Sequence, residues 1–248
     1  ATDEAGVVGR CWINVIDAVQ SAGAGKAIIV AGRRSIHDPV WPSSSFMANK
    51  AYDILRYRGF TDDSIYYLSH DVTSRVDGVP SPLALHDALS GTAVVSSTDP
   101  ALWLILVDHG RRSDGSGEFL LSENDALQAT QLAAWLDEFE ISHPNCSVNV
   151  FLECCYAGAL TETLLADYTG GRRLAIGSAG ASEQAYFIST GMVSFSSTFW
   201  TSVGMGQDIG EAFGAAGSAM ARFQTPVYAG NPAPLIQPIG PDFIAGGD

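Results

Sequence analysis

The sequence predicts an α/β fold in which helices cover both faces of a mainly parallel sheet of about six strands. Two observations predict this class. Short apolar runs of strand length alternate along the chain with segments whose apolar residues recur at helical spacing, which is typical of β-α-β units. The chain also has 248 residues with 46% hydrophobic content, which is enough to fill a sizeable core.

The first part of the chain predicts two strands with a helix between them. Residues 27–31 are a run of Ala, Ile and Val that Gly32 ends, and they predict a central strand. After a loop rich in Pro and Ser, residues 45–58 carry apolar side chains on one helical face. Residues 64–68 predict the second strand. The turn-rich stretch that follows includes a short predicted helix at 82–90, which starts with a proline.

The middle of the chain predicts two strongly apolar strands, at residues 101–107 and 147–153. Between them, a loop is expected at 113–117, and 125–140 predicts the clearest helix because four apolar residues form one stripe. A further helix is expected at about 158–167.

The last part of the chain predicts a short fifth strand at 174–178 and two helices, at 193–203 and 207–223. We find no internal repeat and no linker before the proline-rich end. We therefore expect one domain over residues 1–224, followed by an irregular, Pro-rich C-terminal tail over residues 225–248.

The charge and hydropathy of the chain argue against some classes of function. A formal net charge of −14 argues against a nucleic-acid partner, which needs a basic face. No apolar run reaches the roughly 18 residues that a membrane-spanning helix needs. The first four residues are no signal peptide, but export stays open. The oligomeric state stays open as well.

The cysteines do not predict a disulfide framework or a metal site. Four cysteines in a chain of this length are too few for a framework, and they include no Cys-x-x-Cys pair with a nearby histidine. The loop 114–118 could offer oxygen ligands to calcium, but its spacing fits no calcium-loop motif. We therefore predict no metal and no cofactor, with calcium as the weaker alternative.

Two blocks of sequence end in residues that can do chemistry. The apolar run 101–107 ends at Asp108 and His109, and the run 148–152 ends at Glu153, which two cysteines follow. The carboxyl ends of parallel strands meet at one edge of a sheet, so the histidine and a cysteine can share one crevice. An imidazole beside a thiol is the minimal machinery for acyl transfer through a thioester.

The two adjacent cysteines, Cys154 and Cys155, point to opposite sides of an extended segment, so at most one of them faces the crevice. Gly110, directly after the histidine, allows a close approach of the main chain. Cys155 lies where a strand passes into a helix, so its N–H points outward with the helix dipole behind it. The N–H groups of Gly110 and Cys155 are therefore the predicted donors to a tetrahedral oxyanion.

In combination, these blocks resemble the caspase-like clan of cysteine peptidases, and most closely the legumain family and its bacterial relatives. Residues 28–32 resemble that family's first strand, and residues 108–110 match its histidine motif. Residues 153–158, Glu-Cys-Cys-Tyr-Ala-Gly, resemble its Glu-Ala-Cys-Glu-Ser-Gly motif, which places the nucleophile at Cys155. Residues 177–187 resemble the segment that walls its specificity pocket.

The resemblance implies a caspase-like α/β/α sandwich and a cysteine endopeptidase that acts on protein or peptide substrates. In that reading Cys155 is the nucleophile and His109 is the general acid/base. The similarity to bacterial relatives and the acidity of the chain favour an extracellular or cell-envelope domain of a larger bacterial protein, although the location itself stays open.

The resemblance also indicates residues that would line the pocket for the substrate side chain before the scissile bond. Glu153 lies on the same strand face as Cys155, and Ser178 belongs to the pocket segment. A carboxylate there favours a donor, either Arg or Lys through its charge or Asn through its amide. Legumains place an asparagine and an arginine in the loop after the first strand, where this chain has Arg33 and Arg34 without a clear alignment. We expect cleavage after Asn or a basic residue, and the third catalytic residue stays open.

Three alternatives remain. A transpeptidase or peptide ligase would use the same dyad but would transfer the acyl group to an amine. A catalytically silent caspase-like interaction module is disfavoured because both His109 and Cys155 are present. A generic Rossmann-like ligand-binding domain is disfavoured because the chain lacks a Gly-x-Gly-x-x-Gly loop.

Overall fold

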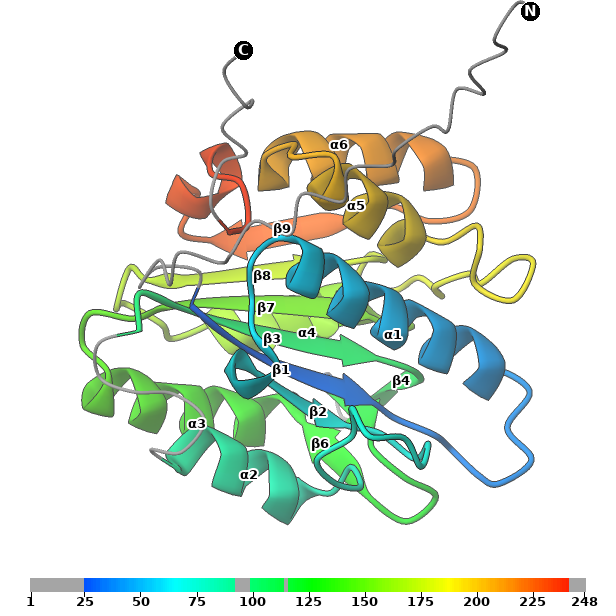
Figure 1. The fold of residues 1–248 in the computed structure, drawn as a ribbon, viewed down its shortest axis with the longest axis horizontal. Helices are drawn as coiled ribbons and strands as arrows, with labels where there is room; N and C mark the ends of the chain where they lie inside the picture. The colour runs from blue at the N-terminus through cyan, green and yellow to red at the C-terminus, as the bar shows by residue number, and fades with distance from the viewer. Residues whose placement is uncertain (1–24, 92–98, 114–115, 241–248) are drawn as a thin grey trace, which may run out of the picture.

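A six-stranded sheet forms the centre of the molecule in the computed structural model, which describes residues 25–91, 99–113 and 116–240 (Figure 1). The strands lie in the order β2-β1-β3-β7-β8-β9, and all neighbours are parallel except β9, which runs antiparallel to β8. This sheet confirms the predicted α/β class. The strands are β1 (Lys26–Ala31), β2 (Ile65–Leu68), β3 (Ala101–Val107), β7 (Ser147–Glu153), β8 (Arg173–Gly177) and β9 (Val227–Gly230).

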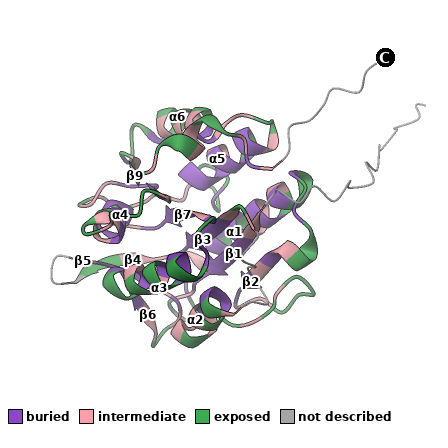
Figure 2. Ribbon diagram, turned by 90° about the vertical axis from the view of Figure 1, so that its left-hand side faces the viewer, coloured by how far each residue is buried: buried purple, intermediate pink, exposed green. Residues whose placement is uncertain are grey.

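Helices cover both faces of the sheet, as Figure 1 shows. One layer packs on one face and is made of α1 (Trp41–Tyr57), α5 (Phe195–Gly204) and α6 (Ile209–Met220). The other layer packs on the opposite face and is made of α2 (Pro82–Ser90), α3 (Ala129–Ser142) and α4 (Ala157–Leu165). Figure 2 shows the central strands buried between helices whose outer faces are exposed.

The five parallel strands are mainly apolar because each one contributes to two cores. Along β1, Ile28 and Val30 pack under α2 and α3, whereas Ile29 and Ala31 pack under α1. Each of these four side chains is completely buried. Burying one Val or Ile side chain contributes about 1.5–3 kcal/mol, so continuous apolar runs are favoured in strands covered on both faces.

A small antiparallel sheet follows β3 and lies next to the carboxyl edge of the large sheet. It consists of β4 (Gly110–Ser113), β5 (Ser116–Leu120) and β6 (Ala126–Gln128). We expected a loop over 113–117, of which 114–115 lie outside the described residues. Strand β4 is short and polar, and β5 has only two apolar residues, Phe119 and Leu120, which are adjacent and do not alternate with polar ones. The sequence therefore lacks the pattern that would predict these strands, and backbone pairing joins them.

Several boundaries differ from the sequence expectations. Helix α1 starts four residues earlier than the predicted 45–58, because Pro42 fits the first turn, where no N–H is needed. Helix α3 starts at Ala129 instead of 125, because residues 126–128 pair with β5. Two short 3-10 helices, η1 (Asp62–Ser64) and η2 (Ala233–Ile236), complete the described elements.

The expectation of an irregular C-terminal tail is wrong for residues 227–230, which form the edge strand β9. Prolines and glycines flank this four-residue strand and hide it in the sequence. Its backbone pairs with β8 from Leu174 to Gly177.

Within the described residues, no helix is long and apolar enough to cross a membrane.

Candidate active site

The carboxyl ends of β3 and β7 bring the two predicted catalytic blocks together. The strands are direct neighbours with Val107 opposite Glu153, and the N–H of Asp108 donates to the carbonyl of Glu153 at 3.2 Å. A side-chain carbon added at Gly110 would lie 2.1 Å from the carbonyl oxygen of Cys155, far inside contact distance. The histidine block therefore runs directly against the cysteine block, and glycine is the residue that fits between them.

The two adjacent cysteines have different environments. Cys154 is completely buried in the core under α3 and α4, whereas Cys155 is only half-buried at the start of α4. Burial raises the pKa of both thiols above the usual range, and for Cys154 the rise is very large. The Sγ of Cys155 lies 3.9 Å from the carbonyl oxygen of Ala185. The exposed position therefore belongs to the second cysteine.

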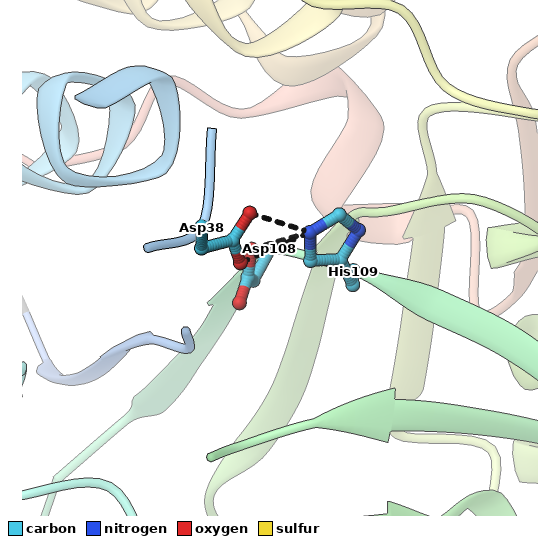
Figure 3. Close-up of side chains that lie close together, drawn as sticks. All are labelled: Asp38, Asp108 and His109. Atoms are coloured by element: carbon cyan, nitrogen blue, oxygen red, sulfur yellow. Dashed lines mark hydrogen bonds and ion pairs between the residues drawn. The ribbon is translucent and has the colours of Figure 1, made fainter. Parts of the chain in front are cut away.

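The imidazole of His109 is oriented by a buried carboxylate that the sequence did not reveal. Its Nε2 lies 3.1 Å from Asp38, whose side chain is completely buried in the loop before α1 (Figure 3). The backbone N–H groups of Arg34 and Val40 also donate to Asp38, at 2.9 and 3.0 Å. In Figure 3 the other ring nitrogen, Nδ1, points away from Asp38.

The hydrogen bonds to Asp38 keep its carboxyl group ionised. Burial acts to raise the pKa of this carboxyl, but the bonds from His109 and from the two backbone N–H groups outweigh it, so the pKa is lowered. An ionised carboxylate at Nε2 requires a proton on that nitrogen, which leaves Nδ1 as the acceptor. In the sequence, Asp38 is an aspartate directly before Pro39 in the loop after the first strand. This pattern is common in turns, so it does not identify Asp38 as a partner of the histidine.

A second carboxyl group, that of Asp108, lies behind the imidazole. It is buried, its Oδ1 accepts from the hydroxyl of Ser44 at 3.0 Å, and the same oxygen is 4.0 Å from Nε2 of His109. Burial raises the pKa of Asp108 to about 7, and the negative charge of Asp38 adds to the shift. This carboxyl group is therefore partly protonated near neutral pH.

The ligand atoms of Asp38, Asp108 and His109 lie within 4.8 Å of one another, close enough to share one cation. One imidazole with two carboxylates suits a zinc-like ion better than calcium, which binds oxygen ligands. The loop considered for calcium includes residues 114–115, which lie outside the described residues. Glu118 in that loop is buried and engaged by Arg111 and Gln128. The absence of a cofactor stays a prediction.

The N–H of Gly110 is directed away from β5 by the pairing of the small sheet. The N–H of Leu120 donates to the carbonyl of His109 at 3.0 Å, which makes these two residues a hydrogen-bonded pair. Gly110 opposes Phe119 one position further, and the pairs of an antiparallel ladder alternate. The N–H of Gly110 therefore points away from β5, as an oxyanion donor must.

The predicted pocket residues Glu153 and Ser178 lie together in a fully buried cluster at the carboxyl ends of β7 and β8. Oε2 of Glu153 accepts from the N–H of Ser196 at 2.5 Å, at the start of α5, and the hydroxyls of Ser178 and Ser196 lie beside the carboxyl. Among the described residues, Oε1 of Glu153 has no hydrogen-bond partner. Burial raises the pKa of Glu153 to about 7 despite these hydroxyls.

The two predicted pocket arginines lie in the loop after β1 and have different surroundings. The guanidinium of Arg33 stacks over the ring of Trp41 at 5.3 Å, and Arg34 is exposed while its backbone N–H bonds to Asp38. No ion pair links either arginine to Glu153 in the described part of the chain. A role of these arginines in substrate binding stays a prediction.

Together, the doubly covered sheet and the arrangement at its carboxyl edge define a caspase-like fold. The chain is similar in structure to caspase-1 from Spodoptera frugiperda, whose crystal structure it matches with a TM-score of 0.60 over 84% of this chain and 87% of that chain. The sequence identity is 12%, so this likeness establishes the fold alone. No protein-family model and no curated protein sequence matches the chain.

Proposed function

We propose that the chain is a cysteine endopeptidase of the legumain-like group. One observation carries this proposal. The imidazole of His109, held by a buried carboxylate, and the half-buried thiol of Cys155 follow two neighbouring strands at the same edge of the sheet. A thiol, an oriented imidazole and a free N–H beside them are the groups that acyl transfer through a thioester requires. The caspase-like fold supports the same class of reaction.

In the proposed reaction, Sγ of Cys155 attacks the carbonyl carbon of the scissile peptide bond while Nδ1 of His109 takes the thiol proton. The N–H groups of Gly110 and Cys155 stabilise the resulting oxyanion. The protonated imidazole then donates its proton to the leaving amine, which yields a thioester. Water, deprotonated by the same imidazole, hydrolyses the thioester and regenerates the thiol.

The environment of Cys155 indicates that proton transfer accompanies the attack. Burial raises the pKa of this thiol, so it is mostly protonated at neutral pH. The imidazole must therefore act as a base during the attack and does not only stabilise a thiolate formed beforehand. Asp38 would support this role, because its carboxylate favours the imidazole that gains a proton.

For specificity, we propose cleavage after Asn or a basic residue. Glu153 and the hydroxyls of Ser178 and Ser196 form a buried cluster of donors and acceptors around the carboxyl end of β7, two residues before Cys155. The carboxyl of Glu153 is partly neutral near pH 7, which suits the amide of Asn, and its ionised form suits Arg or Lys. A large apolar side chain would leave this buried polar cluster unpaired, at a cost of about 1–3 kcal/mol.

A matched set of peptides that differ only in the residue before the scissile bond tests this proposal. We expect the highest kcat/KM for Asn, Arg or Lys, and no cleavage by the Cys155→Ala variant. Equal turnover of Leu or Phe peptides would refute the specificity, and cleavage that survives Cys155→Ala would refute the mechanism. An added amine nucleophile extends the assay, because ligated products would indicate a transpeptidase.

A further inference from the structure

The segment that follows β8, residues 178–187, runs along the turn that carries Cys155. The N–H of Tyr156, directly after the nucleophile, donates to the carbonyl of Glu183 at 2.7 Å. The carbonyl oxygen of Ala185 lies 3.9 Å from Sγ of Cys155. This segment therefore contacts both the thiol and the backbone that positions it.

The backbone at Tyr156 needs such support. Its φ is 59° and its ψ is 26°, a left-handed conformation that is unfavourable for a residue with a side chain. This conformation turns the chain sharply between β7 and α4 and leaves Cys155 at the crevice. The hydrogen bond to Glu183 holds the turn in place from outside the strand.

One buried side chain, that of Gln224, anchors the segment at two points. Its Nε2 donates to the carbonyl of Ser178 at 2.7 Å, and its Oε1 accepts from the N–H of Tyr186 at 2.7 Å. Gln224 is only 4% exposed, so water competes little for these bonds. Gln224 follows α6 and leads into β9, far along the chain from the catalytic blocks.

Between those two points, the side chain of Glu183 ties the segment to the next residue, Thr225. Oε2 of Glu183 accepts from the N–H of Thr225 at 2.6 Å and from the N–H of Gly180 at 3.2 Å, and Oε1 accepts from the hydroxyl of Thr225 at 3.0 Å. The bond from the Thr225 N–H is the main cause of a lowered pKa at Glu183, so this carboxyl is ionised at neutral pH. Charge-assisted bonds of this kind are stronger than neutral ones.

We propose that Gln224 and Glu183 are positioning residues for Cys155, an inference that rests on the proposed peptidase function. We use the word clasp for the hydrogen bonds that join Gln224 and Thr225 to segment 178–187, with Glu183 as the partner of Thr225 within that segment. Neither Gln224 nor Glu183 hydrogen-bonds to Cys155 or His109 in the described structure, so they act through the segment.

Two variants open the clasp without touching the catalytic groups. Gln224→Met keeps the length of the side chain and removes both hydrogen bonds, and Glu183→Gln removes the charge. The matched controls are Gln207→Met, outside the clasp, and Glu162→Gln, on the exposed face of α4. Thr225→Ser keeps both donors and should behave as wild type. For each protein, kcat and KM are measured together with the rate at which iodoacetamide alkylates Cys155, followed by peptide mass spectrometry.

We expect both clasp variants to lower kcat by about 10- to 100-fold with little change in KM, because the thiol is displaced from its reactive position. We expect alkylation of Cys155 to become faster by about threefold or more, because the opened segment exposes the thiol and relieves its desolvation. Slower turnover with faster alkylation distinguishes mispositioning from simple loss of folded protein, since unfolding would also expose Cys154 and Cys146.

The proposal is overturned if the clasp variants match their controls in both kcat and alkylation. It is also overturned if alkylation of all three described cysteines rises equally, because that pattern indicates unfolding. The alkylation measurement does not depend on peptide cleavage. If wild type cleaves no peptide, the proposed function fails, whereas a selective increase at Cys155 in the variants would still show that the clasp positions this thiol.

Discussion

The histidine side and the cysteine side of the crevice are built in different ways. On the histidine side, the imidazole depends on a side chain from a loop, since Asp38 binds Nε2 and is itself held by two backbone N–H groups. On the cysteine side, backbone hydrogen bonds and a left-handed turn at Tyr156 set the position of the thiol. A charged side chain therefore positions the histidine, whereas main-chain geometry positions the cysteine.

The two sides also share one feature, a buried carboxyl at the end of each strand. Asp108 follows β3 and Glu153 ends β7, and burial raises the pKa of each to about 7. The two carboxyl groups differ in their partners. Asp108 lies beside the Asp38–His109 pair, whereas Glu153 lies among hydroxyls and the N-terminus of α5. From this comparison we expect single substitutions on the histidine side to change catalysis. Substitutions at the buried end of β7 should mainly change stability.

The largest expected effect distinguishes the two neighbouring cysteines. Cys155→Ala should abolish peptide cleavage and labelling by an acyloxymethyl ketone, because the nucleophile is lost. Cys154→Ala should keep most of both, because this buried side chain packs in the core on the other side of the strand. Labelling that disappears in Cys154→Ala and survives in Cys155→Ala would reverse the assignment.

The next effect concerns the imidazole. His109→Ala should lower kcat by about 10²- to 10⁴-fold, the usual contribution of general acid–base catalysis, with little change in melting temperature. The side chain of His109 is 19% exposed, and its removal leaves Asp38 hydrogen-bonded to the backbone N–H groups of Arg34 and Val40. His37→Ala, at an exposed neighbour of Asp38, is the control. If the main effect is unfolding, with unchanged turnover per folded molecule, His109 is a structural residue.

A smaller effect tests the role of charge on the histidine side. Asp38→Asn keeps the shape of the side chain but removes the charge that selects the proton on Nε2, so kcat should fall by about 10- to 100-fold while KM changes little. The matched control is Asp63→Asn, at an exposed position in η1. Turnover equal to that of the control would show that Asp38 does not orient the imidazole.

The remaining effect is on stability and not on turnover, and it concerns the cysteine side. The pKa of Glu153 rises from 4.5 to about 7 on folding, so its neutral form stabilises the folded state fully below pH 4.5, and that contribution is lost as the pH rises through about 7. In Glu153→Gln, the decrease in unfolding free energy between pH 4 and pH 8 should be smaller by about 3 kcal/mol. Denaturant unfolding at several pH values measures this difference, and parallel curves for the two proteins would contradict it.

Local patterns in the sequence were enough to predict five of the six strands of the central sheet. The runs 27–31, 101–107 and 147–153 are buried on both faces, and burial of that kind requires continuous apolar residues. The same patterns predicted that His109 and Cys155 would follow neighbouring strands. Glycine at position 110 could be recognised because close approach of two backbones excludes any side chain.

Only the tertiary structure decided which distant residues complete the site. Asp38, Gln224 and Glu183 are ordinary polar residues in loops, and their roles depend on contacts with partners that lie 38 to 71 positions away in the chain. The edge strand β9 was hidden for the same reason, because its pairing with β8 depends on backbone groups that any sequence provides. Periodicity records what a segment buries, whereas hydrogen bonds between remote segments leave no local pattern.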